Sequence, residues 1–368
     1  MRVRNVLLAA TAGTVAAGTV AGVGAVLLAR AAWKGFREIS LRAKVALVTG
    51  ASRGLGLAIA RELAGEGVRL AICARNEEEL RWAQEELQAM GAEVLAIPCD
   101  VGDREQVHRM FEQIHARYGA LHVLVNNAGQ ISVGPIHAQT IEDFEEAMRV
   151  MYWGHVYTVM EVLPEMLARG SGHIANITSI GGKVSIPHLL PYSAAKFAAV
   201  GLSEGLHAEL AKDGVKVTTV VPGLMRTGSH VNAYFKGDHR KEFAWFSVGA
   251  SNPFTSISAT RAARQIVSAI KRGKSEVILS PQAQILALAH GIAPGTTSDA
   301  LGVVNRLMPG SRSTETERFT GKESGNSISD SILTELGRRA GRELHQYPEQ
   351  RGTGTENERG GPEALLAD

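Results

Sequence analysis

Short apolar runs recur along the middle of the chain, and segments with a different pattern separate them. Seven runs of four to seven residues, rich in Val, Ile, Leu and Ala, lie at 44–49, 69–74, 94–99, 121–125, 173–179, 215–221 and 276–279. Strands that are buried on both faces of a parallel sheet have this continuous apolar pattern. The runs therefore predict about seven buried, parallel strands.

The segments between the runs carry apolar residues every three or four positions, which is typical of amphipathic helices. Helices are predicted at 77–90, 104–118, 141–168, 192–212 and 257–272, with a bend near Gly154 in the third. Alternating strands and helices of this length indicate an α/β fold, here a Rossmann-type doubly wound parallel sheet. Residues 228–254, which include several aromatic side chains, have a mixed pattern and are expected to be irregular.

The first 36 residues depart from this alternation. Val6 to Ala29 contains no charged residue, and basic residues precede and follow it. About 20 apolar residues in a helix span the hydrocarbon core of a bilayer. We expect 1–36 to be a transmembrane anchor, with the denser positive charge after it holding a domain at 37–281 on the cytoplasmic side. A cleaved signal peptide and a helix on the bilayer surface remain open alternatives.

Two further regions follow the predicted domain. Residues 282–310 form an apolar, helical extension that Pro294 and Gly295 interrupt, so neither half is long enough to span a bilayer. Residues 311–368 are polar and are expected to be partly disordered, with one short amphipathic helix within 329–344.

Charge and cysteine content restrict the function only loosely. The 368 residues carry a formal net charge of +2, which gives no electrostatic reason to expect nucleic acid as a partner. The two cysteines, Cys73 and Cys99, lie inside apolar runs and are expected to be buried and reduced. We expect no metal site.

A glycine-rich turn follows the first predicted strand and opens a helix. Gly50 permits a tight turn, Gly54 lets the backbone approach a pyrophosphate, and Gly56 lets helix and strand pack closely. The helix N-terminus then offers N–H groups to phosphate. No acidic residue follows the second strand, where Arg75 stands, and Arg53 lies within the loop. Arginines here favour the 2′-phosphate of NADP(H).

The candidate chemistry centres on Tyr192 and Lys196, which share one helix face at i and i+4. A nearby ammonium lowers the pKa of a phenol, so that Tyr192 can exchange a proton with a substrate oxygen. Ser179, at the end of a predicted strand, could hydrogen-bond a substrate carbonyl. These three residues are the predicted catalytic group.

Six motifs in this order resemble those of the short-chain dehydrogenase/reductase family. They are the loop Thr49-Gly50-x-x-x-Gly54-x-Gly56, Asp100-Val101, Asn126-Asn127-Ala128-Gly129, Ser179, Tyr192-x-x-x-Lys196 and Pro222-Gly223-x-x-x-Thr227. The resemblance covers about residues 43–281. It implies an alcohol dehydrogenase or carbonyl reductase, and it agrees with the NADP(H) preference that the arginines indicate. We also expect a homodimer or homotetramer.

The resemblance also assigns residues to the cofactor. The cofactor-binding set comprises Gly50, Ser52, Arg53, Gly54, Leu55, Gly56, Arg75, Asp100, Val101, Asn126, Ala128, Gly129, Tyr192, Lys196, Pro222, Gly223 and Thr227. Asp100 and Val101 would border the adenine, Asn126 the adjoining ribose, and Pro222, Gly223 and Thr227 the nicotinamide.

One position departs from the family pattern. Many members have an asparagine three residues before the glycine of the long helix, where this chain has Met151. Methionine cannot hold a water in the same way, so a catalytically weak or inactive NADP(H)-binding scaffold is the alternative to an enzyme. The aromatic residues of 228–254 and the anchor suggest a small lipophilic substrate, and His188 either faces it or lies on a surface loop.

Overall fold

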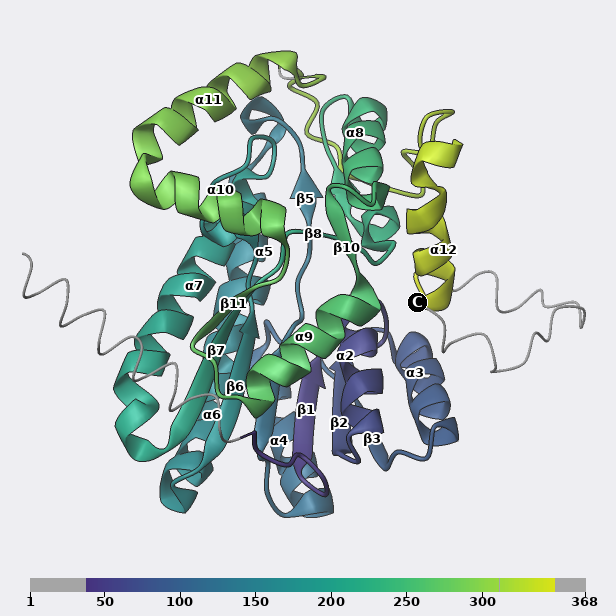
Figure 1. Cartoon of the computed structure of the whole chain (residues 1–368). Helices are drawn as coiled ribbons and strands as arrows, with labels where there is room; N and C mark the ends of the chain where they lie inside the picture. The colour runs from purple at the N-terminus through teal and green to yellow at the C-terminus, as the bar shows by residue number, and fades with distance from the viewer. Residues whose placement is uncertain (1–37, 311, 348–368) are drawn as a thin grey trace, which may run out of the picture. The chain divides into compact units, whose positions relative to one another are not determined.

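A seven-stranded sheet forms the centre of the computed structural model, which describes residues 38–310 and 312–347. Its order is β11-β7-β6-β4-β1-β2-β3, and every neighbouring pair is parallel (Figure 1). The strands are β1 (Val45–Thr49), β2 (Arg69–Ala74), β3 (Val94–Pro98), β4 (Val123–Asn126), β6 (Gly172–Ile177), β7 (Val215–Val221) and β11 (Glu276–Ile278). The predicted doubly wound sheet is confirmed.

Helices cover both faces of this sheet (Figure 1). On one face α2 (Gly54–Gly65) contacts α3 (Glu77–Ala89) and α9 (Ala259–Lys271). On the other, α4 (Arg104–Tyr118), α6 (Gly154–Arg169) and α7 (Leu190–Leu210) enclose a core that includes Leu47, Phe111, Val162 and Ile174. Burying apolar surface in this way is the main favourable term in folding. Cys73 and Cys99 are buried, free thiols here.

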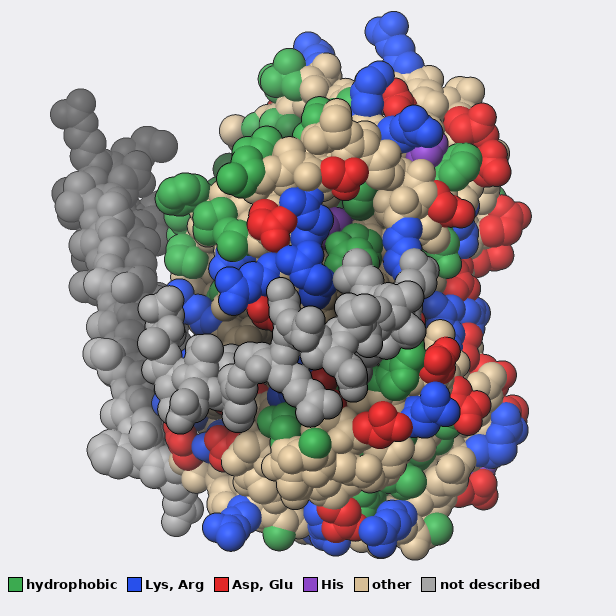
Figure 2. All heavy atoms as spheres, turned by 90° about the vertical axis from the view of Figure 1, so that its right-hand side faces the viewer, with side chains coloured by type: hydrophobic (Ala, Val, Ile, Leu, Met, Phe, Trp, Pro, Cys, Tyr) green, Lys and Arg blue, Asp and Glu red, His purple; other side chains and the backbone are tan. Residues whose placement is uncertain are grey.

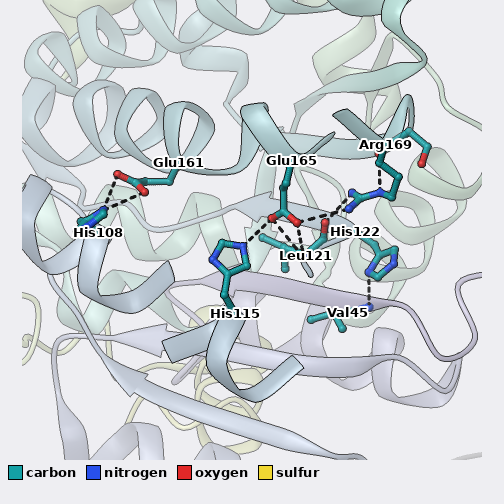
Figure 3. A network of polar contacts seen from close by, with 9 residues as sticks. Val45, His108, His115, Leu121, His122, Glu161, Glu165 and Arg169 are labelled. Atoms are coloured by element: carbon teal, nitrogen blue, oxygen red, sulfur yellow. Dashed lines mark hydrogen bonds and ion pairs between the residues drawn. The ribbon is translucent and has the colours of Figure 1, made fainter. Parts of the chain in front are cut away.

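Polar contacts join α4 to α6 at the surface of this layer (Figure 3). His108 Nδ1 lies 3.2 Å from Glu161, and His115 Nε2 lies 3.0 Å from Glu165. The Glu165 carboxylate also accepts the backbone N–H of Leu121 at 3.1 Å. The hydrogen bond with Glu161 raises the pKa of His108, so the contact of His108 with Glu161 is strongest where His108 is charged.

The predicted long helix at 141–168 is divided by a change of winding. α5 (Ile141–Met148) begins at a capping box formed by Thr140 and Asp143, and a π-helical turn follows at Arg149–Trp153 before α6. π-helical turns widen a helix locally and often occur at functional sites. The expected bend near Gly154 therefore takes this form.

Residues 228–254 are more regular than expected. The structure has β9 (Tyr234–Phe235) and the helix α8 (His239–Ser251) within this segment. β9 joins β5 (Ser132–Val133) and β12 (Phe319–Thr320) in a small sheet, and β8 (Leu224–Arg226) pairs with β10 (Ser256–Ser258). The prediction of irregular structure was wrong, because α8 buries residues on much of its circumference and lacks a clear amphipathic period.

The C-terminal region adds three helices to the domain. The predicted apolar extension is a pair of helices, α10 (Pro281–Ile292) and α11 (Pro294–Leu307), and α12 (Glu335–Glu343) lies within the predicted short helix. Within 38–310 and 312–347, no helix combines the length and apolarity needed to cross a bilayer. The predicted anchor at 1–36 lies outside the described residues.

Candidate active site

A cavity of about 800 Å³ opens beyond the carboxyl ends of the central strands. Ligands bind at this edge of doubly wound sheets, because the strand-to-helix loops converge there. Seventeen of the eighteen predicted site residues line it: Gly50, Ser52, Arg53, Gly54, Leu55, Gly56, Arg75, Asp100, Val101, Ala128, Gly129, Ser179, Tyr192, Lys196, Pro222, Gly223 and Thr227. Asn126 does not.

The glycine loop is held in a shape that its glycines alone permit. Gly50 has φ +65°, and a Cβ on Gly56 would lie 2.2 Å from the Gly50 carbonyl oxygen. The Thr49 hydroxyl oxygen accepts the N–H groups of Asn127 and Ala128 at 2.9 and 3.0 Å, and the Asn127 side chain donates to the Thr49 carbonyl at 2.9 Å. The loop after β4 therefore braces the loop after β1.

The helix that follows the loop has an N-terminus suited to an anion. No side chain caps α2, and its first turn contains no acidic residue. The Gly54 N–H already donates to the Leu344 carbonyl oxygen, so the N–H groups of the next residues and the positive end of the helix dipole are the features that favour phosphate. The residues present therefore fit the pyrophosphate of a dinucleotide.

The two arginines predicted to hold a 2′-phosphate differ in their surroundings. Arg53 Nη1 lies 2.9 Å from a carboxylate oxygen of Glu79, which is buried and also accepts from the Ser52 hydroxyl at 3.4 Å. Arg75 is exposed at the cavity rim. The expectation that this end of the cavity lacks an acid is thus incomplete, because Glu79 reaches it from the first turn of α3 and engages Arg53.

Asn126 takes part in a buried polar network instead of lining the cavity. Its side-chain amide donates to Asn176 Oδ1 at 3.0 Å, and its side-chain oxygen accepts from the Thr158 hydroxyl at 2.7 Å. The Asn176 amide continues the network by donating to the Ser203 hydroxyl oxygen at 3.1 Å. Asn126 therefore links β4, β6 and α6 beneath the site.

The predicted catalytic residues converge at one wall of the cavity. Lys196 Nζ lies 5.9 Å from the centre of the Tyr192 ring and donates to the Ile177 carbonyl oxygen at 2.8 Å. The Ser179 hydroxyl lies within hydrogen-bonding reach of the Tyr192 phenol. Strand β6, whose end leads into Ser179, and helix α7, which begins just before Tyr192, bring the three together.

The electrostatics of this group differ from the expectation based on sequence. Burial raises the pKa of Tyr192, and the hydrogen bond with Ser179 only partly offsets it. Burial also lowers the pKa of Lys196 to about 8. The expected lowering of the phenol pKa by the ammonium is therefore not present, since both groups are taken out of water and the charged form of each becomes costly.

Met151 is fully buried in the π-helical turn, as part of the wall behind Gly129. One turn later stands His155, whose ring is also buried and has no hydrogen-bond partner at either nitrogen among the described residues. Burial and the neighbouring charge of Lys196 lower the pKa of His155 to about 3, so the ring is neutral.

The other end of the cavity is apolar. Its lining includes Ile131, Ile186, Leu189, Leu224, Met225, Trp245, Phe246 and Leu286. Phe235 and Phe243 do not line the cavity, but they are buried with Phe246 in a core cluster that borders it. Three phenylalanines of 228–254 thus belong to one core cluster, and Phe246 of that cluster also lines the cavity.

His188 neither lies on the surface nor lines the cavity. Its side chain is buried, and Nδ1 lies 2.8 Å from a carboxylate oxygen of Glu242 on α8. The same carboxylate accepts the indole N–H of Trp245 at 2.7 Å. His188 therefore connects the loop before α7 to the helix that carries Trp245, which sequence spacing could not indicate.

Comparison with known proteins agrees with this architecture. The family model described as short chain dehydrogenase matches residues 44–235. SadH of Mycobacterium tuberculosis, described by name as an oxidoreductase, is 34% identical over 248 residues, which are 67% of this chain and 89% of the relative. A dehydrogenase/reductase SDR family protein 7-like of Anopheles gambiae is 33% identical over 247 residues, 66% of this chain and 76% of that protein.

Solved structures give the same result. A short-chain dehydrogenase from Streptomyces avermitilis matches 73% of this chain and 99% of its own with a TM-score of 0.62 and 32% identity. A variant of the actinorhodin polyketide ketoreductase, crystallised with NADPH, matches 66% of this chain and 97% of its own with a TM-score of 0.58 and 32% identity.

Proposed function

Because the chain belongs to the short-chain dehydrogenase family of oxidoreductases, we propose that it interconverts an alcohol and a carbonyl compound with NADP(H). The convergence of Ser179, Tyr192 and Lys196 on one wall of the cavity carries the proposal. The bound nicotinamide would supply or accept the hydride. The chain supplies the proton, the orientation and a site shielded from water.

Each residue of the group has a distinct part in carbonyl reduction. The Ser179 hydroxyl donates a hydrogen bond to the substrate carbonyl oxygen and fixes its position. The Tyr192 hydroxyl gives its proton to that oxygen as negative charge develops there, and its raised pKa keeps the proton in place until then. The Lys196 ammonium stabilises the phenolate that remains. Alcohol oxidation uses the same groups in reverse.

NADP(H) is proposed over NAD(H) because Arg75 stands exposed at the cavity rim after β2. A guanidinium can form a paired hydrogen bond with a phosphate. The NADPH in the crystallised actinorhodin ketoreductase supports this preference by analogy. Glu79 weakens this preference for NADP(H), because its carboxylate already binds the Arg53 guanidinium.

A lipophilic substrate is proposed from the apolar end of the cavity. That end is walled by Trp245 and Phe246 of α8 and by Leu286 of α10. Pockets lined mainly by apolar side chains with a few polar groups select ligands by shape and hydrophobic burial. A membrane anchor at 1–36, with the domain on its cytoplasmic side and assembled as a homodimer or homotetramer, would bring the site close to such a substrate.

Purified protein tests the proposal by NADPH oxidation with a panel of lipophilic ketones and aldehydes. At least one should be reduced, and Tyr192→Phe should lower turnover by at least ~10², the scale of a general acid, while leaving the Kd for NADPH nearly unchanged. Near-normal turnover in the variant would exclude this role for Tyr192.

The alternative, a cofactor-binding scaffold, is favoured by Met151 in the π-helical turn. Tight NADPH binding without turnover on any member of the panel would support it. Met151→Asn should then create or raise activity if the missing amide is the cause.

A further inference from the structure

The C-terminal segment reaches the glycine loop. Helix α12 packs against α8 and β8, and the chain then passes through Leu344, His345 and Gln346, here called the strap. The backbone N–H of Gly54 donates to the Leu344 carbonyl oxygen at 2.9 Å. Gln346 lines the cavity, and a Cβ on Gly54 would lie 2.8 Å from its amide nitrogen. Gly54 therefore leaves room for the strap.

Polar contacts on both sides hold the strap in this position. His345 Nε2 lies 2.7 Å from Glu86 of α3, and Arg61 of α2 donates to the Glu343 carbonyl oxygen at 2.8 Å. Burial opposes ionisation of Glu86, but hydrogen bonds with His345 and Arg61 outweigh it and lower its pKa to about 2. The carboxylate is therefore charged at neutral pH and binds both partners.

On the opposite side, the strap contacts the segment that covers the substrate end. The Asn232 amide donates to the side-chain oxygen of Gln346 at 2.8 Å and to its backbone carbonyl at 3.1 Å. Asn232 lines the same cavity. The Gln346 side-chain oxygen is thus held, and its amide nitrogen lies toward the glycine loop.

The helix before the strap is seated by close packing. A Cβ on Gly337 would lie 2.1 Å from Ser251 Oγ on α8, and a Cβ on Gly228 would lie 2.3 Å from Gly341 Cα. Larger side chains at these positions would push α12 away from the domain. Two glycines of α12 therefore fix where the strap begins.

We propose that the strap is a wall of the dinucleotide site, with the Gln346 amide facing the phosphate and ribose portion of the cofactor. It borders the site and does not fill it, since the cavity keeps about 800 Å³ with the strap in place. A bound dinucleotide is held between the glycine loop and the strap, and it leaves when the strap opens. The inference rests on the proposed function only in requiring that a nicotinamide dinucleotide binds.

Dissociation of NADPH from the full-length protein tests this proposal. Its rate can be followed by nicotinamide fluorescence in stopped flow after mixing with excess NADP⁺. Gln346→Ala should raise the rate about fivefold, the effect of one hydrogen bond of ~1 kcal/mol. Gly337→Leu, which unseats α12, should raise it at least tenfold. Arg339→Ala, on the exposed side of α12, is the matched control and should leave it unchanged.

Hydrogen exchange supplies a second readout that needs no turnover. Adding NADPH to the parent should slow exchange in 340–347, and Gly337→Leu should abolish that protection. If Gly337→Leu does not fold, His345→Ala, which removes the Glu86 contact, takes its place with the same expectation.

Opposite results would overturn the inference. Unchanged dissociation in a variant whose strap exchanges freely would show that the strap does not hold the cofactor. Tighter NADPH binding in the same variant would show that the strap competes with it. A parent protein that binds no nicotinamide dinucleotide would refute the proposed function as well.

Discussion

Arg75 and Glu79 set opposite electrostatic preferences at one end of the cavity. Arg75→Ala should weaken NADPH binding by roughly 1.5–3 kcal/mol, as expected for a charge-assisted hydrogen bond, and change NADH binding little. Arg81→Ala, an exposed arginine on the same helix as Glu79, is the control. Fluorescence titration with both cofactors measures the effect, and equal affinities of the parent for NADPH and NADH would contradict it.

Glu79 also shows what residue-level prediction missed. Spacing along the chain predicted a site at the glycine loop, Ser179, Tyr192 and Lys196, and the structure brings these residues to one cavity at the edge of the sheet where the strands end. It could not show that Glu79, buried in the first turn of α3, would engage Arg53. That contact joins the glycine loop to α3 and depends on how the two pack in the folded chain.

His155 makes the fold sensitive to acid. Its pKa is about 3 in the folded protein and about 6.5 when unfolded. Above pH 6.5 both states are neutral and the group contributes no pH dependence. Below pH 6.5 the unfolded state binds a proton at His155 that the folded state does not bind. The free energy of unfolding therefore decreases by up to ~1.4 kcal/mol for each unit by which the pH is lowered, until His155 is protonated in the folded state as well.

His155→Leu should therefore flatten part of the acid-induced loss of stability. In urea unfolding at pH 7, 6, 5 and 4, the free energy of unfolding of the variant should increase relative to that of the parent each time the pH is lowered. Residual acid sensitivity is expected, because burial also lowers the pKa of His173 and His230 to about 4. His137→Ala, at an exposed position, should run parallel to the parent. A constant difference between His155→Leu and the parent would contradict the assignment.

Among the elements, the junction of β1 and α2 leaves little room for a larger side chain. Gly56→Ala places a Cβ 2.2 Å from the Gly50 carbonyl oxygen, and both groups belong to a loop that Asn127 braces. The loop must distort, so we expect a loss of ~1–3 kcal/mol in stability and of most NADPH affinity. Thermal unfolding and titration measure both. Gly65→Ala, with open space around the added Cβ, is the matched control in the same helix.

The strands and the helices between them could be predicted because each is a local pattern. The segment 228–254 could not, since α8 packs Phe243 and Phe246 on Phe235 in one core cluster, and this cluster forms only when β9 and α8 come together in the folded chain. The π-helical turn was likewise visible only as a bend near Gly154. The conformation of these elements depends on tertiary packing, and the hydrophobic periodicity of the sequence does not predict that packing.

At the scale of the whole molecule, the N-terminal segment predicts attachment to a membrane. We expect alkaline carbonate to leave the full-length chain in isolated membranes, because the uncharged residues 6–29 are long enough to cross the hydrocarbon core. A protein lacking residues 1–35 should be mostly released. Protease added to the cytoplasmic face should digest the domain. A mature protein beginning at Ala32 would show that the segment is a cleaved signal.

Some retention of the shortened protein is expected from α10 and α11. These helices expose Ile285, Leu288, Ile292, Val303, Val304 and Leu307. Exposed apolar patches of this kind bind bilayer surfaces or partner proteins. Charged substitutions at Leu288 and Val304 should release the shortened protein fully, which separates surface binding from a membrane span.

The strap also gives the protein an order of assembly during synthesis. The contact of Arg61 with Glu343 joins residues 282 apart in the chain, and the glycine loop emerges from the ribosome long before its C-terminal neighbour exists. At 5–20 residues per second the interval is roughly 15–60 s. During that time the central strands can pair around a nucleotide site that is still open on one side. With the strap as the proposed wall of the dinucleotide site, the nascent domain is expected to be able to bind the cofactor before residues 344–346 are made.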